Sequence, residues 1–175
     1  MVELETREQA LAYLAQMSPT ETFQVRQIPQ GWVATKVLSP EQMATGQAVG
    51  LARLVIDSET GIVYQYPSWS ERMVADAYTT FKQTRINRAG SQIYPYQWTI
   101  TVERTQENDQ TITYQMTAES LTDPPEPTQH HPLTIEKHTL ATDPTDWLSS
   151  VAMSHAEWMS RQNQGVWPEV ATSQV

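Results

Sequence analysis

The chain lacks cysteine, and none of its apolar runs approaches the length of a membrane span. Without cysteine it can form neither a disulfide nor a metal site with thiolate ligands. A helix that crosses a bilayer needs roughly 20 apolar residues. The N-terminal sequence MVELETREQALAYL also has no basic segment followed by an apolar run, which a signal peptide would have. We therefore expect a soluble, cytoplasmic protein that does not enter a membrane.

Positive charge is scarce as well, with 11 Lys and Arg against 20 Asp and Glu and a net charge of −9. Residues 1–90 hold 8 basic and 9 acidic residues, a net of −1, whereas residues 91–175 hold 3 and 11, a net of −8. Such a surface repels nucleic acids and anionic membranes, which argues against both as partners. The acidic second half serves either solubility alone or the attraction of a basic protein partner.

Motifs for catalysis or metal binding are missing too. The adjacent residues His130 and His131 point to opposite sides of an extended segment, so they rarely bind one metal. Asp57 and Glu59 lie in a predicted hairpin turn, where carboxylates are usually solvated and simply favour the turn. General acid–base catalysis needs carboxylates with shifted pKa values in a shielded cleft. We predict no catalytic residue, no metal site and no cofactor.

Hydrophobic periodicity is what the sequence does offer. It predicts helices after the N-cap candidates Thr6 and Ser70, and a last helix that starts in the segment Asp-Pro-Thr-Asp at residues 143–146. Alternating apolar residues predict seven strands, at about residues 22–28, 32–38, 51–56, 62–66, 98–102, 112–118 and 133–140. The run at 51–56 is almost continuously apolar, as in a central strand covered on both faces. The order α-β-β-β-β-α-β-β-β-α indicates an α+β fold, with one or more antiparallel sheets and helices packed on one face.

The length suits one α+β domain over residues 1–175, or two subdomains at about residues 1–88 and 92–165. Residues 121–132 carry four prolines and are predicted to form a surface loop. Residues 166–175 are predicted to be a frayed tail.

The six tryptophans fall into two groups. Trp32, Trp98, Trp147 and Trp158 lie on predicted apolar faces, which favours packing in the core. Trp69 and Trp167 lie near the ends of predicted elements and are candidates for exposed anchors at an interface.

A Gly-Trp-Val strand and a hairpin with an Asp-x-x-Thr-Gly turn resemble a pattern found in the YrhB-like immunity-protein family. These small bacterial proteins neutralise toxins used against neighbouring cells. The resemblance covers about the first 80 residues, and eight residues carry it: Gly31, Trp32, Val33, Val55, Asp57, Thr60, Gly61 and Val63. The chain departs from the pattern at residues 49–52, where the family tends to have Gly-Asn-Gly-Pro and this chain has Val-Gly-Leu-Ala. The resemblance implies that the hairpin is scaffold and that function lies elsewhere on the surface.

We therefore hypothesise a non-enzymatic immunity protein that binds a cognate, basic toxin domain and occludes its active site. The candidate partner-binding residues are Glu103, Glu107, Asp109, Glu119, Asp123, Glu126 and Trp69. One alternative is a structural or adaptor protein of a phage or secretion system that self-associates through exposed aromatics. Another is a ligand-binding or enzymatic domain with a pocket between sheet and helices, although no group of residues supports it. The sequence leaves monomer and homodimer equally open.

Overall fold

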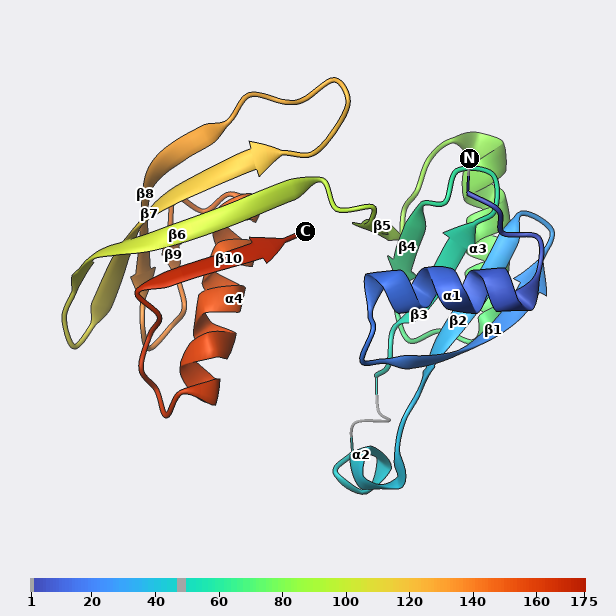
Figure 1. Ribbon diagram of the computed structural model, residues 1–175, viewed down its shortest axis with the longest axis horizontal. Helices are drawn as coiled ribbons and strands as arrows, with labels where there is room; N and C mark the ends of the chain where they lie inside the picture. The colour runs from blue at the N-terminus through green and yellow to red at the C-terminus, as the bar shows by residue number, and fades with distance from the viewer. Residues whose placement is uncertain (1, 47–49) are drawn as a thin grey trace. The chain divides into compact units, whose positions relative to one another are not determined.

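A computed structural model describes residues 2–46 and 50–175 (Figure 1). Val49, which begins the departure from the family pattern, lies outside the described residues. The chain folds into two compact units, residues 1–95 and 96–175, referred to below as the first and second unit. Each unit has its own five-stranded antiparallel sheet. The α+β class and the approximate order of elements predicted from the sequence are confirmed.

The strands of the first unit follow one another across the sheet in chain order. They are β1 (Thr22–Ile28), β2 (Gly31–Val37), β3 (Arg53–Asp57), β4 (Val63–Tyr66) and β5 (Ser91–Tyr94). The helices are α1 (Arg7–Met17), the short α2 (Pro40–Ala44) and α3 (Glu71–Thr84). Because β3 is central, it has hydrogen-bonded neighbours on both sides.

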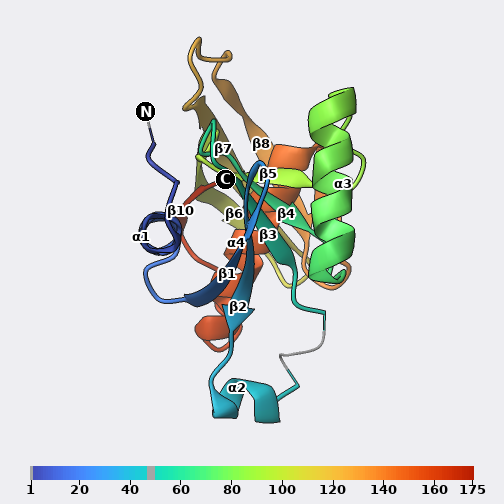
Figure 2. The ribbon, with the colours of Figure 1, turned by 90° about the vertical axis from the view of Figure 1, so that its right-hand side faces the viewer.

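Helices cover both faces of this first sheet, with α1 and α3 on opposite sides (Figure 2). Tyr13 and Leu14 of α1 share a buried cluster with Ile56 of β3, whereas Val74 of α3 packs against the other face with Val55. The prediction that helices lie on one face is therefore wrong for this unit. The apolar run at 51–56 had indicated the correct arrangement, since a strand covered on both faces has no polar side.

The predicted helix starts are confirmed by their caps. The Thr6 side chain accepts a hydrogen bond from the backbone N–H of Gln9, and the Gln9 side chain accepts one from the backbone N–H of Thr6. The side chains of Ser70 and Asp146 likewise cap α3 and α4 (Trp147–Gln162).

The second unit is a sheet covered on one face by a single helix. Its strand order is β10-β6-β7-β8-β9, and α4 packs against β6, β7, β9 and β10 (Figure 1). The strands are β6 (Trp98–Glu107), β7 (Thr111–Ser120), β8 (Gln129–Glu136), β9 (Thr142–Asp143) and β10 (Val170–Gln174). The core under α4 includes Ile100, Tyr114, Met116, Leu133 and Ile135. The opposite face of the sheet carries polar residues, so the alternation predicted for β6 and β7 is confirmed.

The C-terminal residues do not form a frayed tail. Residues 170–174 pair along β6, from Val170 opposite Glu103 to Gln174 opposite Thr99. Trp167, predicted to be an exposed anchor, is only 7% exposed and belongs to the core. The short, mostly polar segment VATSQ carries too little apolar periodicity to signal a strand, so the sequence could not reveal this pairing.

Candidate partner-binding surfaces

The β3–β4 hairpin of the first unit ends in a turn that is held from several sides. Gly31 lies so close to β3 that a Cβ atom there would be 1.9 Å from the carbonyl oxygen of Ile56. Gly61 adopts φ +74°, as predicted for a turn glycine, and its carbonyl accepts a hydrogen bond from the Tyr13 hydroxyl at 2.7 Å. Trp32 is buried, and its Nε1–H donates to the Leu4 carbonyl at 2.9 Å. These residues set the geometry of the scaffold.

Asp57 is buried in this turn, not solvated as the sequence suggested, and is only 2% exposed. Its carboxylate accepts hydrogen bonds from Lys82 Nζ at 2.8 Å, from the Tyr78 hydroxyl, and from the backbone N–H groups of Glu59 and Thr60 at 2.9 Å each. Lys82 also pairs with Glu59 at 3.1 Å. Asp57 thus ties the hairpin turn to α3 through a buried ion pair.

This arrangement fixes the protonation state of each member. Burial alone would raise the pKa of Asp57, but the hydrogen bonds from Lys82, Tyr78 and the two amides outweigh it and hold the pKa below the ordinary value of 3.8. Its hydrogen bond to Asp57 raises the pKa of Lys82, and burial together with the hydroxyl's own hydrogen bond to Asp57 raises the pKa of Tyr78. A carboxylate held as an anion at neutral pH is a poor proton donor or acceptor, so the cluster is a structural one.

Three basic residues, Lys82, Arg85 and Arg88, lie in the last turn of α3 or just after the helix. The Lys82 side chain is only 18% exposed and pairs with Asp57. Arg85 and Arg88 are exposed, and neither forms an ion pair among the residues that the structure describes. The free basic charge at this end of α3 therefore comes from the two arginines.

Trp69, two residues before the start of α3, lies half-buried in a cleft of about 390 Å³. Its backbone carbonyl accepts a hydrogen bond from Arg53 Nε at 3.1 Å, which fixes the loop before α3. The cleft is lined by Tyr66, Trp69, Ala77, Thr80, Thr84, Ile86, Asn87, Arg88 and Ala89. Trp69 is therefore a cleft residue of the first unit, whereas the six acidic candidates all belong to the second unit.

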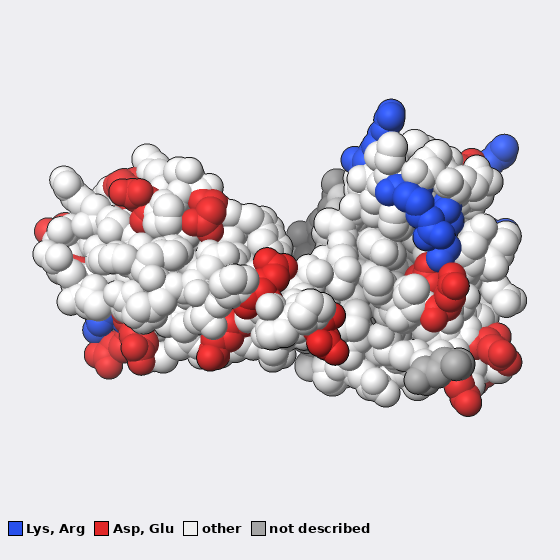
Figure 3. Space-filling view, turned by 90° about the horizontal axis from the view of Figure 1, so that it is seen from above, with Lys and Arg blue, Asp and Glu red and all other residues white. Residues whose placement is uncertain are grey.

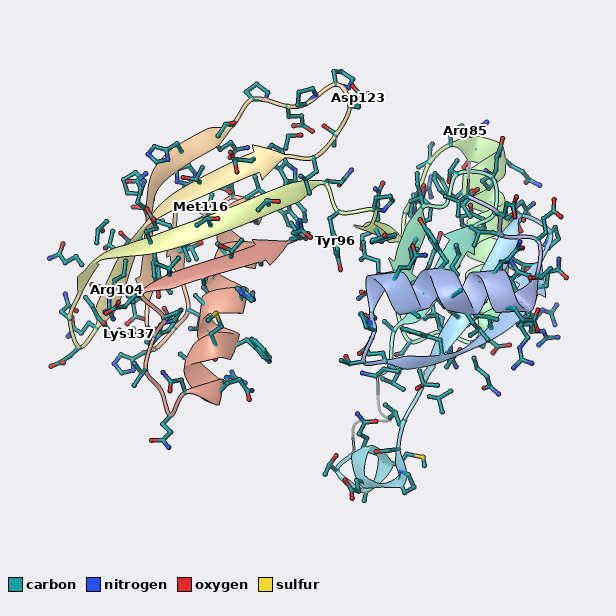
Figure 4. All side chains as sticks on the ribbon, in the orientation of Figure 1. Arg85, Tyr96, Arg104, Met116, Asp123 and Lys137 are labelled. Carbon is teal, nitrogen blue, oxygen red and sulfur yellow. The ribbon has the colours of Figure 1, made fainter. Side chains whose placement is uncertain are left out.

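The six acidic candidates do not form one continuous patch. Glu107 and Asp109 belong to the end of β6 and the β6–β7 turn, and Glu103 lies in the middle of β6. Glu119 is paired with Thr99 at the other end of the same strands. Glu107 lies eight positions along β6 from Thr99, which is roughly 26 Å at about 3.3 Å per residue. Asp123 and Glu126 lie in the loop after β7, at the Glu119 end (Figure 4).

Glu107 differs from the other five because cations of its own unit neutralise it. It accepts from Lys137 Nζ and from Arg104, each at 2.7 Å. A hydrogen bond from Lys137 is the main reason that its pKa lies below the usual value. Figure 4 shows Arg104 and Lys137 at one end of the unit and Asp123 at the other. Glu107 therefore stabilises the hairpin and carries little charge toward a partner.

The remaining acidic residues leave the second unit with a large uncompensated charge. Its three cations all pair with acidic residues of the unit: Arg104 with Glu107 and Glu169, Lys137 with Glu107, and Arg161 with Glu157. Eight acidic residues have no ion pair within this fully described unit: Glu103, Asp109, Glu119, Asp123, Glu126, Glu136, Asp143 and Asp146. On the face seen in Figure 3, acidic atoms far outnumber basic ones over this unit.

Two tryptophans predicted to lie in the core are exposed instead. Trp147 and Trp158 of α4 are 56% and 57% exposed, and the ring of Trp158 stacks on His155 with centroids 6.0 Å apart. Leu148, Ala152, Ala156 and Ser160 face the sheet in their place. Small residues let the helix approach the sheet closely, which leaves the larger aromatics on the outer side. The pattern of apolar residues in the sequence did not show which side of α4 faces the sheet, the side with the two tryptophans or the side with the small residues.

Comparison with known protein families concerns the first unit. Residues 5–85 match the Immunity protein 35-like domain. This immunity domain runs from α1 through α3 and contains all eight residues that carry the resemblance to an immunity-protein family, which is thereby confirmed. No curated protein and no solved structure gives a significant match to the chain. A domain of this family suggests a bacterial immunity protein with a non-enzymatic role.

Within the immunity domain, the residues of the matched pattern are buried or form the turn, so they explain the fold and leave partner selection to other surfaces. Val33, Val55 and Val63 belong to its two cores. No group of three or more His, Asp or Glu side chains in residues 2–46 and 50–175 could hold a metal ion. No helix within those ranges is long and apolar enough to cross a membrane.

Proposed function

We propose that this chain is an immunity protein that binds a cognate secreted toxin, basic in character, and neutralises it by occluding its active site. The match of residues 5–85 to an immunity domain is the observation that carries this proposal. Because the residues of the matched pattern stabilise the fold, we place the surface that contacts the toxin on exposed residues outside that pattern.

The charge of the second unit supports a basic partner. All three of its cations are already paired, and eight acidic residues are not. Such a surface attracts a cationic protein over several ångströms and raises the association rate, most strongly at low salt. Toxin domains that act on nucleic acids carry the positive charge that their substrate requires. We assign this steering role to Glu103, Asp109, Glu119, Asp123 and Glu126.

The outer face of α4 supplies the short-range contacts in this proposal. Trp147 and Trp158 are 11 residues apart on the helix, which is roughly 16 Å at about 1.5 Å per residue. Tryptophan and arginine dominate the binding energy of many interfaces. Exposed indole rings beside unpaired carboxylates suit the Arg and Lys side chains of a basic partner, which stack on aromatic faces. Asp143 and Asp146 lie directly before Trp147 in the chain.

The first experiment is to recover the partner with the full, tagged chain from cells that produce it naturally, and to identify it by mass spectrometry. A stoichiometric partner with a toxic domain supports the proposal. Recovery of the bait alone, or of a multi-subunit assembly, would contradict it and favour the structural or adaptor alternative.

The recovered partner then permits a kinetic test by biolayer interferometry at several salt concentrations. The triple variant Glu119→Gln, Asp123→Asn, Glu126→Gln should lower the association rate at least 5-fold at low salt and weaken its salt dependence, because steering follows net charge. The matched control is a second triple variant, Glu3→Gln, Glu5→Gln, Glu41→Gln, which removes the same charge from exposed positions of the first unit.

The double variant Trp147→Ala, Trp158→Ala should instead raise the dissociation rate at least 10-fold, because short-range contacts act after encounter. Met73→Ala, at a residue of α3 that is 52% exposed, controls for the loss of an exposed apolar side chain. Equal effects of the test variants and their controls would show that these surfaces do not contact the toxin.

A further inference from the structure

The cleft beside Trp69 has the size and composition of a small-molecule site. Its volume of about 390 Å³ falls within the roughly 300–1,000 Å³ typical of ligand pockets. Apolar surface comes from Trp69, Ala77, Ile86 and Ala89, which lie before, within and after α3. Such sites are mostly apolar and orient their ligand through a few polar groups.

Tyr66 provides one of these polar groups. The residue is 1% exposed, and its hydroxyl is the one buried side-chain polar atom in residues 2–46 and 50–175 that has no hydrogen-bond partner. A Cβ atom at Gly90 would lie 2.6 Å from Tyr66 Cζ, so the hydroxyl end of the ring lies against the segment that carries Asn87 and Ala89. Buried hydroxyls are nearly always paired, and an exception calls for an explanation.

The hydroxyl is a hydrogen-bond donor throughout the physiological range. Burial, with a smaller contribution from Tyr64, raises the pKa of Tyr66 to about 12. The group therefore keeps its proton and lacks an acceptor.

The other polar groups of the cleft are donors as well. Asn87 Oδ1 accepts from the backbone N–H of Gly90 at 2.8 Å, while its Nδ2 has no acceptor in the described part of the chain. The guanidinium of Arg88 also has no partner there. The hydroxyls of Thr80 and Thr84 already donate to carbonyls of α3, and no Asp or Glu lines the cleft. The cleft thus offers one cation and two neutral donors without acceptors of their own.

We propose that this cleft binds a small aromatic carboxylate. The carboxylate would accept from Arg88, whose planar fork matches its two oxygens, and from Tyr66 and Asn87. The flat apolar body of the ligand would lie against Trp69 and Ile86. This site lies on the first unit and does not depend on toxin binding, so it stands or falls separately from the proposed function.

The test uses the full chain labelled with 5-fluorotryptophan and followed by ¹⁹F NMR, with the resonance of Trp69 assigned through Trp69→Phe. Indole-3-carboxylate is the probe, and indole-3-carboxamide is its neutral counterpart of nearly the same shape. We expect the carboxylate to shift the Trp69 resonance saturably and the carboxamide to bind at least 10-fold more weakly, with the resonance of the buried Trp32 unchanged.

Variants locate the interaction within the cleft. Arg88→Gln should weaken binding of the carboxylate to the level of the carboxamide, and Tyr66→Phe should weaken it several-fold. Arg72→Gln is the matched control, since it removes the same charge from an exposed residue of α3 that does not line the cleft, and it should leave affinity unchanged. An unshifted Trp69 resonance, equal affinity for the two probes, or equal effects of Arg88→Gln and Arg72→Gln would overturn the proposal.

Discussion

Replacing Lys82 by methionine tests the physical account of the immunity domain most severely. Lys82→Met keeps the length and apolar stem of the side chain but removes the ammonium that pairs with Asp57. The carboxylate of Asp57 is 3% exposed as a side chain, so water cannot take the place of the lost cation. The first unit should therefore lose stability although its apolar core is intact.

The expected loss is about 3 kcal/mol. Removing one partner of a buried ion pair costs roughly 3–5 kcal/mol, because an uncompensated charge stays in the interior. We place the loss at the lower end, since Asp57 keeps its hydrogen bonds from Tyr78 and from the amides of Glu59 and Thr60. Asp57→Asn in the same background should restore part of the stability, because it removes the unpaired charge while an amide oxygen still accepts from the turn.

Urea unfolding of the full chain, followed through the ¹⁹F resonance of 5-fluoro-Trp32, reports on the first unit alone. Lys36→Met is the matched control, since Lys36 pairs with Glu21 where both side chains are about a third exposed. Exposed pairs contribute roughly 0–1 kcal/mol. A loss for Lys82→Met no larger than that of Lys36→Met would refute the claim that Asp57 is held as a buried anion.

The same pair predicts a pH dependence. Because the pKa of Asp57 is lower in the folded than in the unfolded state, its stabilisation is complete above the ordinary value of 3.8 and is lost as the pH falls through the folded value. In Lys82→Met, burial still raises the pKa while the strongest opposing interaction is gone. The acid unfolding of the first unit should therefore move to higher pH, and an unchanged acid midpoint would contradict this account.

Two further predictions concern packing. Gly31→Ala should destabilise the first unit by about 3 kcal/mol in the same urea assay, because its Cβ would overlap the Ile56 carbonyl and force β2 or β3 to move. A variant as stable as the original chain would contradict this close approach of the two strands. In the second unit, Trp98→Ala should lower the free energy of unfolding by about 3–5 kcal/mol, because Trp98 is buried. Trp147→Ala should change it by about 0.5 kcal/mol or less, because Trp147 is exposed. Equal losses of stability in thermal unfolding would contradict these exposures.

Local signals in the sequence predicted much of the fold correctly. Thr6 and Ser70 cap helices where their side chains indicated, the last helix starts in the predicted segment at residues 143–146, and Gly61 has the positive φ expected of its turn. The apolar run ending at Ile56 also revealed a strand that is covered on both faces. These features depend on residues close together in the chain, so the sequence contains the information directly.

Features that depend on distant segments were missed. Asp57 looked like a solvated turn residue because Tyr78 and Lys82, which bury it, lie more than 20 residues further along the chain. Trp158 lies on an apolar stripe of α4, but Ala152 and Ala156 are the residues that face the sheet.

The candidate site was predicted only in part. The acidic excess of the second half can be counted directly from the sequence. That Glu107 is neutralised depends on Lys137, 30 residues away, and that Glu119 lies far from Glu107 depends on strand register. Neither can be inferred from the order of charges along the chain.

The central claim is that this chain protects a cell against a toxin, and the most direct measurement is growth. The toxic domain of the recovered partner is expressed from an inducible promoter in a sensitive host, with or without the full chain. The account predicts that growth stops without the chain and is restored when it is co-expressed, and that the triple variant Glu119→Gln, Asp123→Asn, Glu126→Gln protects less well than its matched control. Growth arrest that the chain does not relieve, although it is folded and present in excess, would contradict the assignment of an immunity protein.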